Sequence, residues 1–221
     1  ASRDSVPPRT GFASWLDGAG TFADVAIDPD APFNIIYSSG TTGEPKGIVQ
    51  PQSMRWAYAK RAHRFGYGAD VVALVSTPLY SNTTLVVFFP VLAFGGCAVL
   101  MSKFDALRWL ELAQNHRVTH AMLVPVQYER LLSHPDFDRF DLSAFRFKFA
   151  TSAPFAAATK RAAITRWPGE LIEVYGSTEG GGSCILEASK HPTKLATVGH
   201  PAPGHDIRLI DEDGNELPRD A

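Results

Sequence analysis

The chain contains little cysteine and no excess of basic charge. Its 221 residues include two cysteines, Cys97 and Cys184, whose separation matches no metal-binding or redox motif. A disulfide-stapled fold is therefore excluded, and we expect a reducing, cytoplasmic location. Lysine and arginine total 21 against 23 acidic residues, which gives a formal net charge of −2. Nucleic-acid-binding proteins usually carry a basic excess, so nucleic acid is not an expected partner.

Hydrophobic runs long enough to cross a membrane are also lacking. One apolar segment, residues 85–101, has no charged side chain but is shorter than the roughly 20 residues that a spanning helix needs. Pro90 and the pair Gly95-Gly96 interrupt it. We expect a buried helix, a glycine turn and a buried strand at Cys97–Met101, and no membrane span.

Short apolar runs alternate with helical segments along the chain. Strands are predicted at 33–37, 71–75, 97–101, 120–124, 145–150 and 171–175, and helices at 51–65, 105–115, 125–132 and 155–167. In the strand at 145–150, Phe145, Phe147 and Phe149 are expected to face one way. This alternation predicts an α/β fold with a mostly parallel β-sheet flanked by helices. A strand at 206–210 and the turn Asp213-Gly214 predict a short β-hairpin near the carboxyl end.

A glycine-rich segment, SSGTTGEPKG at 38–47, directly follows the first predicted strand, which we expect to be buried. Gly40 and Gly43 let the backbone N–H groups approach an anion, and Lys46 adds a positive charge. Four hydroxyl donors surround them: Ser38, Ser39, Thr41 and Thr42. The pattern favours a phosphate-binding loop, although Pro45 stands where the standard P-loop has its second glycine. A flexible surface loop is the alternative.

A second segment, YGSTEGGG at 175–182, follows the last of the predicted parallel strands. Tyr175 offers an aromatic face for stacking a base, and Thr178 offers a hydroxyl to a phosphate. Glu179 is a hard oxygen ligand of the kind that Mg²⁺ prefers. Taken alone, the segment is equally consistent with a plain turn at a strand end. The sequence contains no serine-hydrolase elbow and no zinc-protease motif around His116 and His120.

The two segments, in this order, resemble the adenylate-forming superfamily of acyl-CoA synthetases, aryl-CoA ligases, luciferases and peptide-synthetase adenylation domains. Further segments from about residue 12 onward are similar to that family: DPDAPFNIIYSSGTTG, TPLY, RVTHAMLVP, SAPF and VGHPAPGHDIRLIDEDGNEL. The resemblance implies that ATP activates a fatty or aromatic carboxylic acid to an acyl-adenylate. A thiol, usually that of coenzyme A, then displaces AMP.

The resemblance also implies roles for individual residues. Thr178, Glu179 and Lys46 would be catalytic, with Thr178 on the α-phosphate and Glu179 on Mg²⁺. The β- and γ-phosphates would be held by Ser38, Ser39, Gly40, Thr41, Thr42, Gly43 and Lys46. The adenine would be flanked by Tyr175 and by the turn Ser152, Ala153 and Pro154, with Glu173 and Gly176 nearby. The family often has glycine before the Ala-Pro turn, where this chain has Thr151 and Ser152.

The acid pocket would follow the TPLY segment. Ser81 stands where the family commonly has a histidine or an aromatic residue, and Thr83 and Val87 fall at pocket-lining positions. Their neighbours are apolar and bring no cation or carboxylate, which favours a fatty or aromatic acid over an amino acid. Ordinary core packing of these side chains is the alternative.

The resemblance divides the chain into a lead-in segment (1–32), an α/β nucleotide-binding subdomain (33–186) and the start of a β-rich subdomain (187–221). It implies a central fragment of a larger amino-terminal domain, since the family's ribose-binding aspartate and mobile carboxyl-terminal domain with its catalytic lysine lie beyond it. We expect the chain alone to bind ATP weakly and to be inactive. Two alternatives remain open: an amino-acid adenylation domain and a non-catalytic nucleotide-binding domain.

Overall fold

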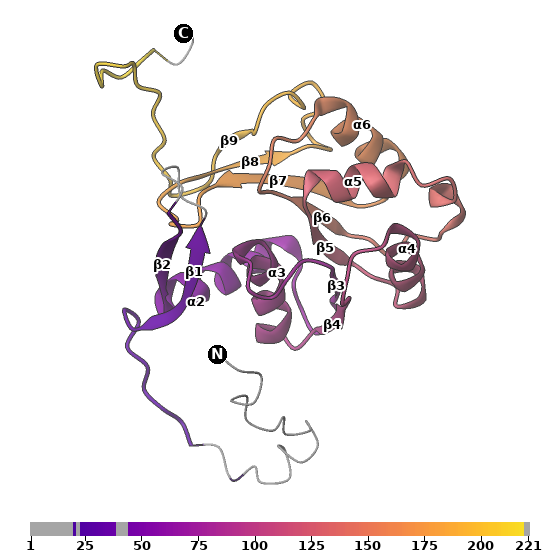
Figure 1. Ribbon diagram of the computed structural model, residues 1–221, viewed down its shortest axis with the longest axis horizontal. Helices are drawn as coiled ribbons and strands as arrows, with labels where there is room; N and C mark the ends of the chain where they lie inside the picture. Colours follow the sequence, from indigo (N-terminus) through magenta and orange to yellow (C-terminus); the bar gives the residue numbers. More distant parts are fainter. Residues whose placement is uncertain (1–19, 21–22, 39–43, 219–221) are drawn as a thin grey trace.

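The computed structural model describes residues 20, 23–38 and 44–218, with the backbone alone at Ser38 (Figure 1). The body of the molecule is a seven-stranded sheet in the order β4-β3-β5-β6-β7-β8-β9. Its strands are β3 (Val72–Val75), β4 (Cys97–Leu100), β5 (His120–Leu123), β6 (Phe147–Ala150), β7 (Glu170–Gly176), β8 (Ser183–Glu187) and β9 (His200–Pro201). Neighbours from β4 to β7 pair in parallel, whereas β8 and β9 pair antiparallel. The predicted α/β fold with a mostly parallel sheet is confirmed.

Helices cover both faces of this sheet. They are α2 (Gln52–Ala62), α3 (Asn82–Ala93), α4 (Ala106–Asn115), α5 (Pro125–Leu132) and α6 (Ala157–Arg166), with short 3₁₀ turns at His63–Phe65 and Phe137–Arg139. On one face, α4, α5 and α6 pack around Trp109 and Trp167, whose rings meet edge-on at 5.2 Å. On the other face, α2 and α3 cover a second apolar cluster that includes Val91 and Phe149. The two clusters make the sheet the middle layer of three.

Local signals fix several of these elements. Asp105 caps α4, since its carboxylate accepts the main-chain N–H of Arg108 at 2.8 Å, and Pro125 occupies the first position of α5. The apolar segment 85–101 folds as predicted into a helix, a glycine turn and a strand. A side chain at Gly96 would lie 2.8 Å from the carbonyl oxygen of Val71, so the turn requires glycine there.

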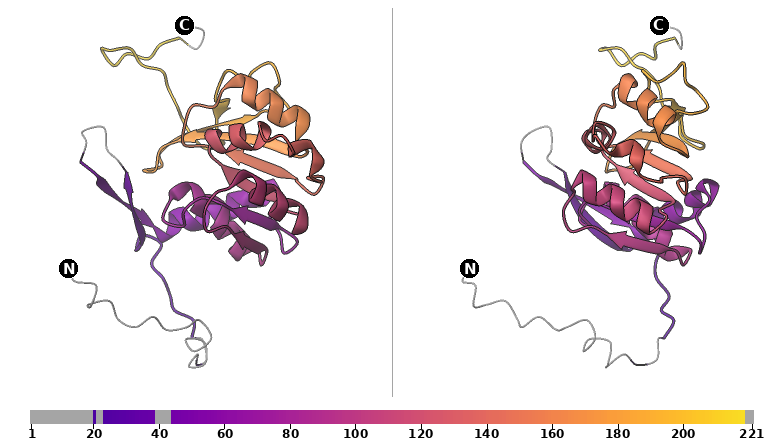
Figure 2. Two further views of the ribbon diagram at one scale, coloured as in Figure 1. Left: turned by 45° about the vertical axis from the view of Figure 1, so that its right-hand side comes forward. Right: turned by 90° about the vertical axis from the view of Figure 1, so that its right-hand side faces the viewer.

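Two predictions about burial are wrong. Strand β4 is not buried, because it is the last strand of the sheet, and Leu100 is 57% exposed. The predicted strand at 33–37 forms as β1 (Pro32–Ser38) but lies outside the parallel sheet. It pairs antiparallel with β2 (Lys46–Pro51), a strand that was not predicted, in a two-stranded ribbon that stands away from the main sheet (Figure 2). Because little packs on one face of this ribbon, Ile35 and Tyr37 are largely exposed.

Three further differences concern the second half of the chain. Phe145 precedes β6 and packs with Trp109, whereas Phe147 and Phe149 lie on the opposite side of the sheet. Strand β8 was not predicted. The segment 206–210 is not a regular strand, since it makes a single antiparallel bridge, Ile210 to Glu216, around the predicted turn.

Some predictions remain untested. Most of the predicted lead-in segment (1–32) falls outside the described residues. The boundary between subdomains at residue 186 stays a prediction. Within the described ranges, no helix has the length and apolar character needed to cross a bilayer.

Candidate functional site

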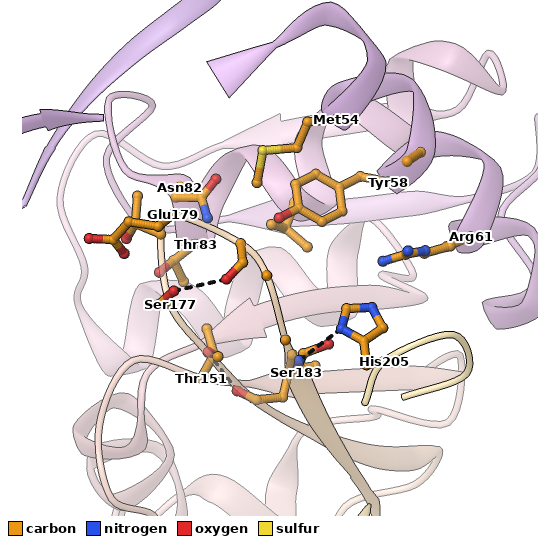
Figure 3. Close-up of a pocket in the computed structure, with 18 of the residues that line it drawn as sticks. Met54, Tyr58, Arg61, Asn82, Thr83, Thr151, Ser177, Glu179, Ser183 and His205 are labelled. Carbon is orange, nitrogen blue, oxygen red and sulfur yellow. Dashed lines mark hydrogen bonds between the residues drawn. The ribbon is translucent and has the colours of Figure 1, made fainter. Parts of the chain in front are cut away.

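An open cavity of about 780 Å³ lies at the carboxyl ends of the parallel strands. The chain passes from β3 outward to β4 and then returns past β3 to β5, so the order reverses between β3 and β5. Ligands of open α/β sheets bind in the crevice at such a reversal. The cavity is lined by α2, the first turn of α3, the ends of β5 and β6, and the segment 176–183 after β7, with Gly204 and His205 at one side (Figure 3).

The segment after β7 forms a tight glycine turn in the cavity wall. Its turn is closed by the Gly180 N–H, which donates to the Ser177 carbonyl oxygen at 3.2 Å. Gly180 has a φ of +84°, a conformation that residues with a side chain rarely adopt. This geometry presents Thr178 and Glu179 together, with the Glu179 carboxylate exposed.

The segment after β6 supplies two hydroxyl groups. Thr151 donates to the Val174 carbonyl oxygen at 2.7 Å, which ties this segment to β7. Ser152 has a φ of +79°, which is strained for a residue other than glycine. Its hydroxyl lies 2.6 Å from that of Thr83 at the start of α3. A hydroxyl pair therefore joins the segments after β3 and β6 within the cavity wall.

A buried polar network lies behind the same wall. Arg55 of α2 donates to the side-chain oxygens of Asn34, Gln50 and Asn82, with 2.9 Å between Arg55 Nη1 and Asn82 Oδ1. The Gln50 amide in turn donates to the Thr178 carbonyl oxygen at 2.8 Å. Burial lowers the pKa of Arg55, but a guanidinium remains protonated at neutral pH.

Two basic side chains lie on the side of the cavity away from Glu179 (Figure 3). Arg61 comes from the last turn of α2. His205 accepts the Ser183 main-chain N–H on Nδ1 at 3.0 Å, so its Nε2 carries the proton in the neutral ring. The cavity wall therefore holds donors for an anionic or hydrogen-bond-accepting ligand on this side as well.

Five of the predicted site residues come together on this cavity: Thr83, Ser152, Gly176, Thr178 and Glu179. Their proposed roles stay predictions, but their common position does not depend on the resemblance.

Other predicted residues lie around or away from it. Ala153, Pro154 and Tyr175 are exposed and do not line the cavity, and Lys46 is exposed at the start of β2. Ser81 precedes α3, and Val87 is buried beside a smaller apolar cavity of about 160 Å³. The residues predicted to bind the β- and γ-phosphates fall largely outside the described part: Ser39, Gly40, Thr41, Thr42 and Gly43.

Glu173, predicted to lie near the adenine, does not line this cavity, and its role stays a prediction. It is buried on the α6 side of β7, where its carboxylate pairs with the ammonium group of Lys160. Burial raises the pKa of Glu173, and Lys160 opposes that rise. Lys160 also donates to the Thr197 carbonyl oxygen at 3.0 Å. In this arrangement Glu173 does not reach the cavity.

Sequence reasoning missed five polar residues in or behind the wall: Gln50, Arg55, Arg61, Asn82 and His205. Four of them lie in no quoted motif, and His205 lies in the segment VGHPAPGHDIRLIDEDGNEL, where no role was assigned to it. The one available signal was the run from Gln50 to Arg61, which is rich in polar and charged side chains.

The side chains at the cavity suit a metal ion that takes most of its ligands from a bound nucleotide and from water. In the ranges that the structure covers, no group of three His, Cys, Asp or Glu side chains is placed to hold a metal. Glu179 is a single carboxylate at the cavity edge. Mg²⁺ is usually held by one or two carboxylates together with phosphate oxygens and water, so Glu179 fits that role beside a bound nucleotide.

Comparisons with known proteins find a matching family and several relatives. The model of the family described as "AMP-binding enzyme" matches residues 3–221. An indoleacetate–CoA ligase of Aromatoleum aromaticum is 30% identical over 88% of the chain, and a medium/long-chain-fatty-acid–CoA ligase of Mycobacterium tuberculosis is 28% identical over 86%. The chain spans 38% and 34% of these two relatives.

A solved structure has a similar fold. ATP-bound MatB from Rhodopseudomonas palustris superposes with a TM-score of 0.77 and 28% sequence identity. The match covers 94% of this chain and 41% of that protein.

Proposed function

The chain belongs to the AMP-binding enzyme family, and we propose that the whole protein uses ATP to activate a carboxylic acid as an acyl-adenylate. Formation of the acyl-adenylate releases pyrophosphate, and the thiol of coenzyme A then attacks the acyl carbon and displaces AMP to give the thioester. One observation carries the proposal: Thr178, Glu179, Gly176, Ser152 and Thr83 line a single cavity at the carboxyl ends of the parallel strands. The residues come from three separate segments, so their meeting is a property of the fold and not of one motif.

The groups in this cavity are positioning groups. Transfer between phosphate and acyl groups depends mainly on holding the reactants in line and on stabilising negative charge. Thr178 offers a hydroxyl to the α-phosphate, and Glu179 offers a carboxylate to Mg²⁺. Magnesium, when bound, would neutralise phosphate charge. Lys46 approaches the phosphates from the start of β2, and Tyr175 with Ser152, Ala153 and Pro154 borders the adenine.

The acid occupies the apolar side of the cavity. Thr83 and Val86 line it, and the smaller cavity beside it is lined by Val87, Phe149 and Ile185, with Arg61 and Arg64 also in its wall. These walls suit a fatty or aromatic acid. Because the matched relatives are much longer than this chain, we expect residues outside it to complete the site and this chain alone to be inactive.

ATP–pyrophosphate exchange with a panel of fatty and aromatic acids tests the proposal on the full-length protein. Exchange that depends on one class of acid is expected, and absence of exchange with every acid would refute adenylate formation. Robust exchange by residues 1–221 alone would show that the remaining segments are not needed. Adding coenzyme A or a carrier-protein thiol after adenylate formation identifies the acceptor.

Replacement of Lys46 by alanine separates an enzyme from a nucleotide-binding scaffold. In an enzyme, K46A lowers the exchange rate, because the side chain contacts the phosphates during the reaction. Unchanged exchange in K46A would favour the scaffold. Exchange driven by amino acids, in place of fatty or aromatic acids, would favour a peptide-synthetase adenylation domain.

A further inference from the structure

Arg55 is a buried cation to which the proposed reaction assigns no role. It is 5% exposed, and all of its hydrogen bonds within the described residues go to neutral amide oxygens. Buried charged side chains are normally paired with an opposite charge, because removing an ion from water is costly. An arginine surrounded by amides is therefore retained at a cost to stability, which calls for a functional reason.

The three amide partners come from three parts of the fold. Asn34 lies in β1, Gln50 lies in β2, and Asn82 is the first residue of α3 and lines the cavity. The planar guanidinium presents donors in fixed directions, so one side chain sets the relative position of all three. Gln50 links this network to the segment after β7, because its amide donates to the Thr178 carbonyl oxygen at 2.8 Å.

The positive charge of Arg55 is not cancelled by these contacts. Amide oxygens solvate the guanidinium but carry no net charge. The rings of Tyr58 and Phe89 each lie 5.6 Å from its central carbon and keep water away. In a surrounding of low dielectric constant, an unneutralised charge acts over a longer distance than it does in water. The cavity wall formed by Asn82 and Thr178 lies between this charge and any ligand.

We propose that Arg55 is a positioning residue, which holds the Thr178–Glu179 segment and the first turn of α3 in place and supplies positive potential to the phosphate end of a bound nucleotide. This inference rests on the proposed function, since it assumes that the cavity takes ATP. A purely structural cross-link predicts something different: loss of stability with unchanged discrimination between charged and uncharged ligands.

Steady-state ATP–pyrophosphate exchange on the full-length protein tests the electrostatic part. Arg55→Met should raise the KM for ATP about tenfold, which corresponds to the loss of one charge-assisted interaction. Inhibition by adenosine, which has no phosphate, should change less than twofold. Arg55→Lys keeps the charge and should recover part of the affinity for ATP. Equal effects on ATP and adenosine, or no effect on either, would overturn the proposal.

Lys60→Met is the matched control. It removes one positive charge from the next turn of α2, but Lys60 is exposed and makes no contact with the network. Its KM for ATP should stay within twofold of the wild-type value. A rise as large as that in Arg55→Met would mean that any cation on α2 has this effect, which contradicts a specific role for Arg55.

Hydrogen exchange of residues 176–183 in this chain tests the positioning part without relying on activity. Arg55→Met and Gln50→Leu should each accelerate exchange there about tenfold, because the link to Thr178 is lost. Lys60→Met should not. An unchanged rate of hydrogen exchange at residues 176–183 in both Arg55→Met and Gln50→Leu would refute the positioning role. If the wild-type full-length protein shows no pyrophosphate exchange with any acid, the proposed function fails, while this measurement still decides whether Arg55 orders the segment.

Discussion

His120 should make the stability of this chain fall steeply below neutral pH. It lies in β5, is 0% exposed, and packs against the ring of Tyr67 at 4.6 Å. Its Nε2 lies 2.9 Å from the Phe65 carbonyl oxygen and therefore carries a proton. Its Nδ1 lies 2.8 Å from the Thr119 hydroxyl, whose one proton is shared between this nitrogen and the Val72 carbonyl oxygen at 3.1 Å. Both nitrogens of the neutral ring thus have a polar partner.

Charging this ring is costly in the folded state. Burial is the main cause that lowers the pKa of His120 to about 4, and Arg146 adds to the effect, while the Phe65 carbonyl and Asp70 oppose it. The pKa of histidine in an unfolded chain is about 6.5. Between these two values the unfolded chain binds a proton that the folded chain does not. The free energy of unfolding therefore decreases as the pH falls from 6.5 towards 4.

The size of the effect follows from the two pKa values. Between pH 7 and pH 5 the linkage relation gives a loss of about 2 kcal/mol from this one group. Urea denaturation of residues 1–221, followed by tryptophan fluorescence at pH 7, 6 and 5, measures it. His120→Gln is the control, since its amide can still donate to Phe65 but does not titrate.

The comparison between the two proteins removes the contribution of other titrating groups. The wild-type chain should lose about 2 kcal/mol more than His120→Gln over this pH interval. Equal losses in the two proteins would refute the reasoning, because they would mean that His120 becomes charged in the folded state without cost.

Three other predictions concern single residues. Ser152→Ala keeps the strained backbone and loses the hydroxyl contact to Thr83, whereas Ser152→Gly relieves the strain, so the glycine variant should be more stable than the alanine variant by about 1 kcal/mol in urea denaturation. The opposite order would show that residue 152 is not strained. Lys148→Met should cost about 3 kcal/mol of stability, because the buried ammonium group of Lys148 donates to the main-chain carbonyls of residues 167–169; a cost under 1 kcal/mol would mean that water replaces it. In the full-length protein, Glu179→Gln should raise the Mg²⁺ concentration for half-maximal pyrophosphate exchange about tenfold, and an unchanged requirement would remove Glu179 as the ligand.

The sequence predicted correctly those helix starts that depend on residues within one turn of the chain. Asp105 and Pro125 mark helix starts through groups within one turn, and both helices form where expected. Strand β4 was recognised but was wrongly expected to be buried, since its exposure depends on its place at the end of the sheet. Strand β8 was missed because Ser183–Glu187 is short and follows a glycine run that reads as a loop.

The same distinction applies to the candidate site. Thr178 and Glu179 belong to a recognisable segment. Because the strands are parallel, this segment lies at the carboxyl edge of the sheet, where Thr83 and Ser152 also line the cavity. The Arg55 network could not be read from the sequence, because its partners at positions 34, 50 and 82 meet only in the folded chain. Glu173 is a different case: the family resemblance implied a place near the adenine, and strand alternation turns its side chain towards Lys160.

A net charge of −2 is compatible with a site for a polyanion, because the positions of individual cations near the site matter more than the total charge. Many surface cations of this chain are neutralised nearby; Arg108, Arg166 and Lys190, for example, each lie 2.8 Å from a carboxylate oxygen. Among the described residues, the hydrogen bonds of Arg55 go to amide oxygens alone, and Arg61 lines the cavity directly. Field strength at a concave, partly dry site depends on such unneutralised groups far more than on the total charge. Composition predicts no nucleic-acid partner, but only the fold indicates where an anion would be held.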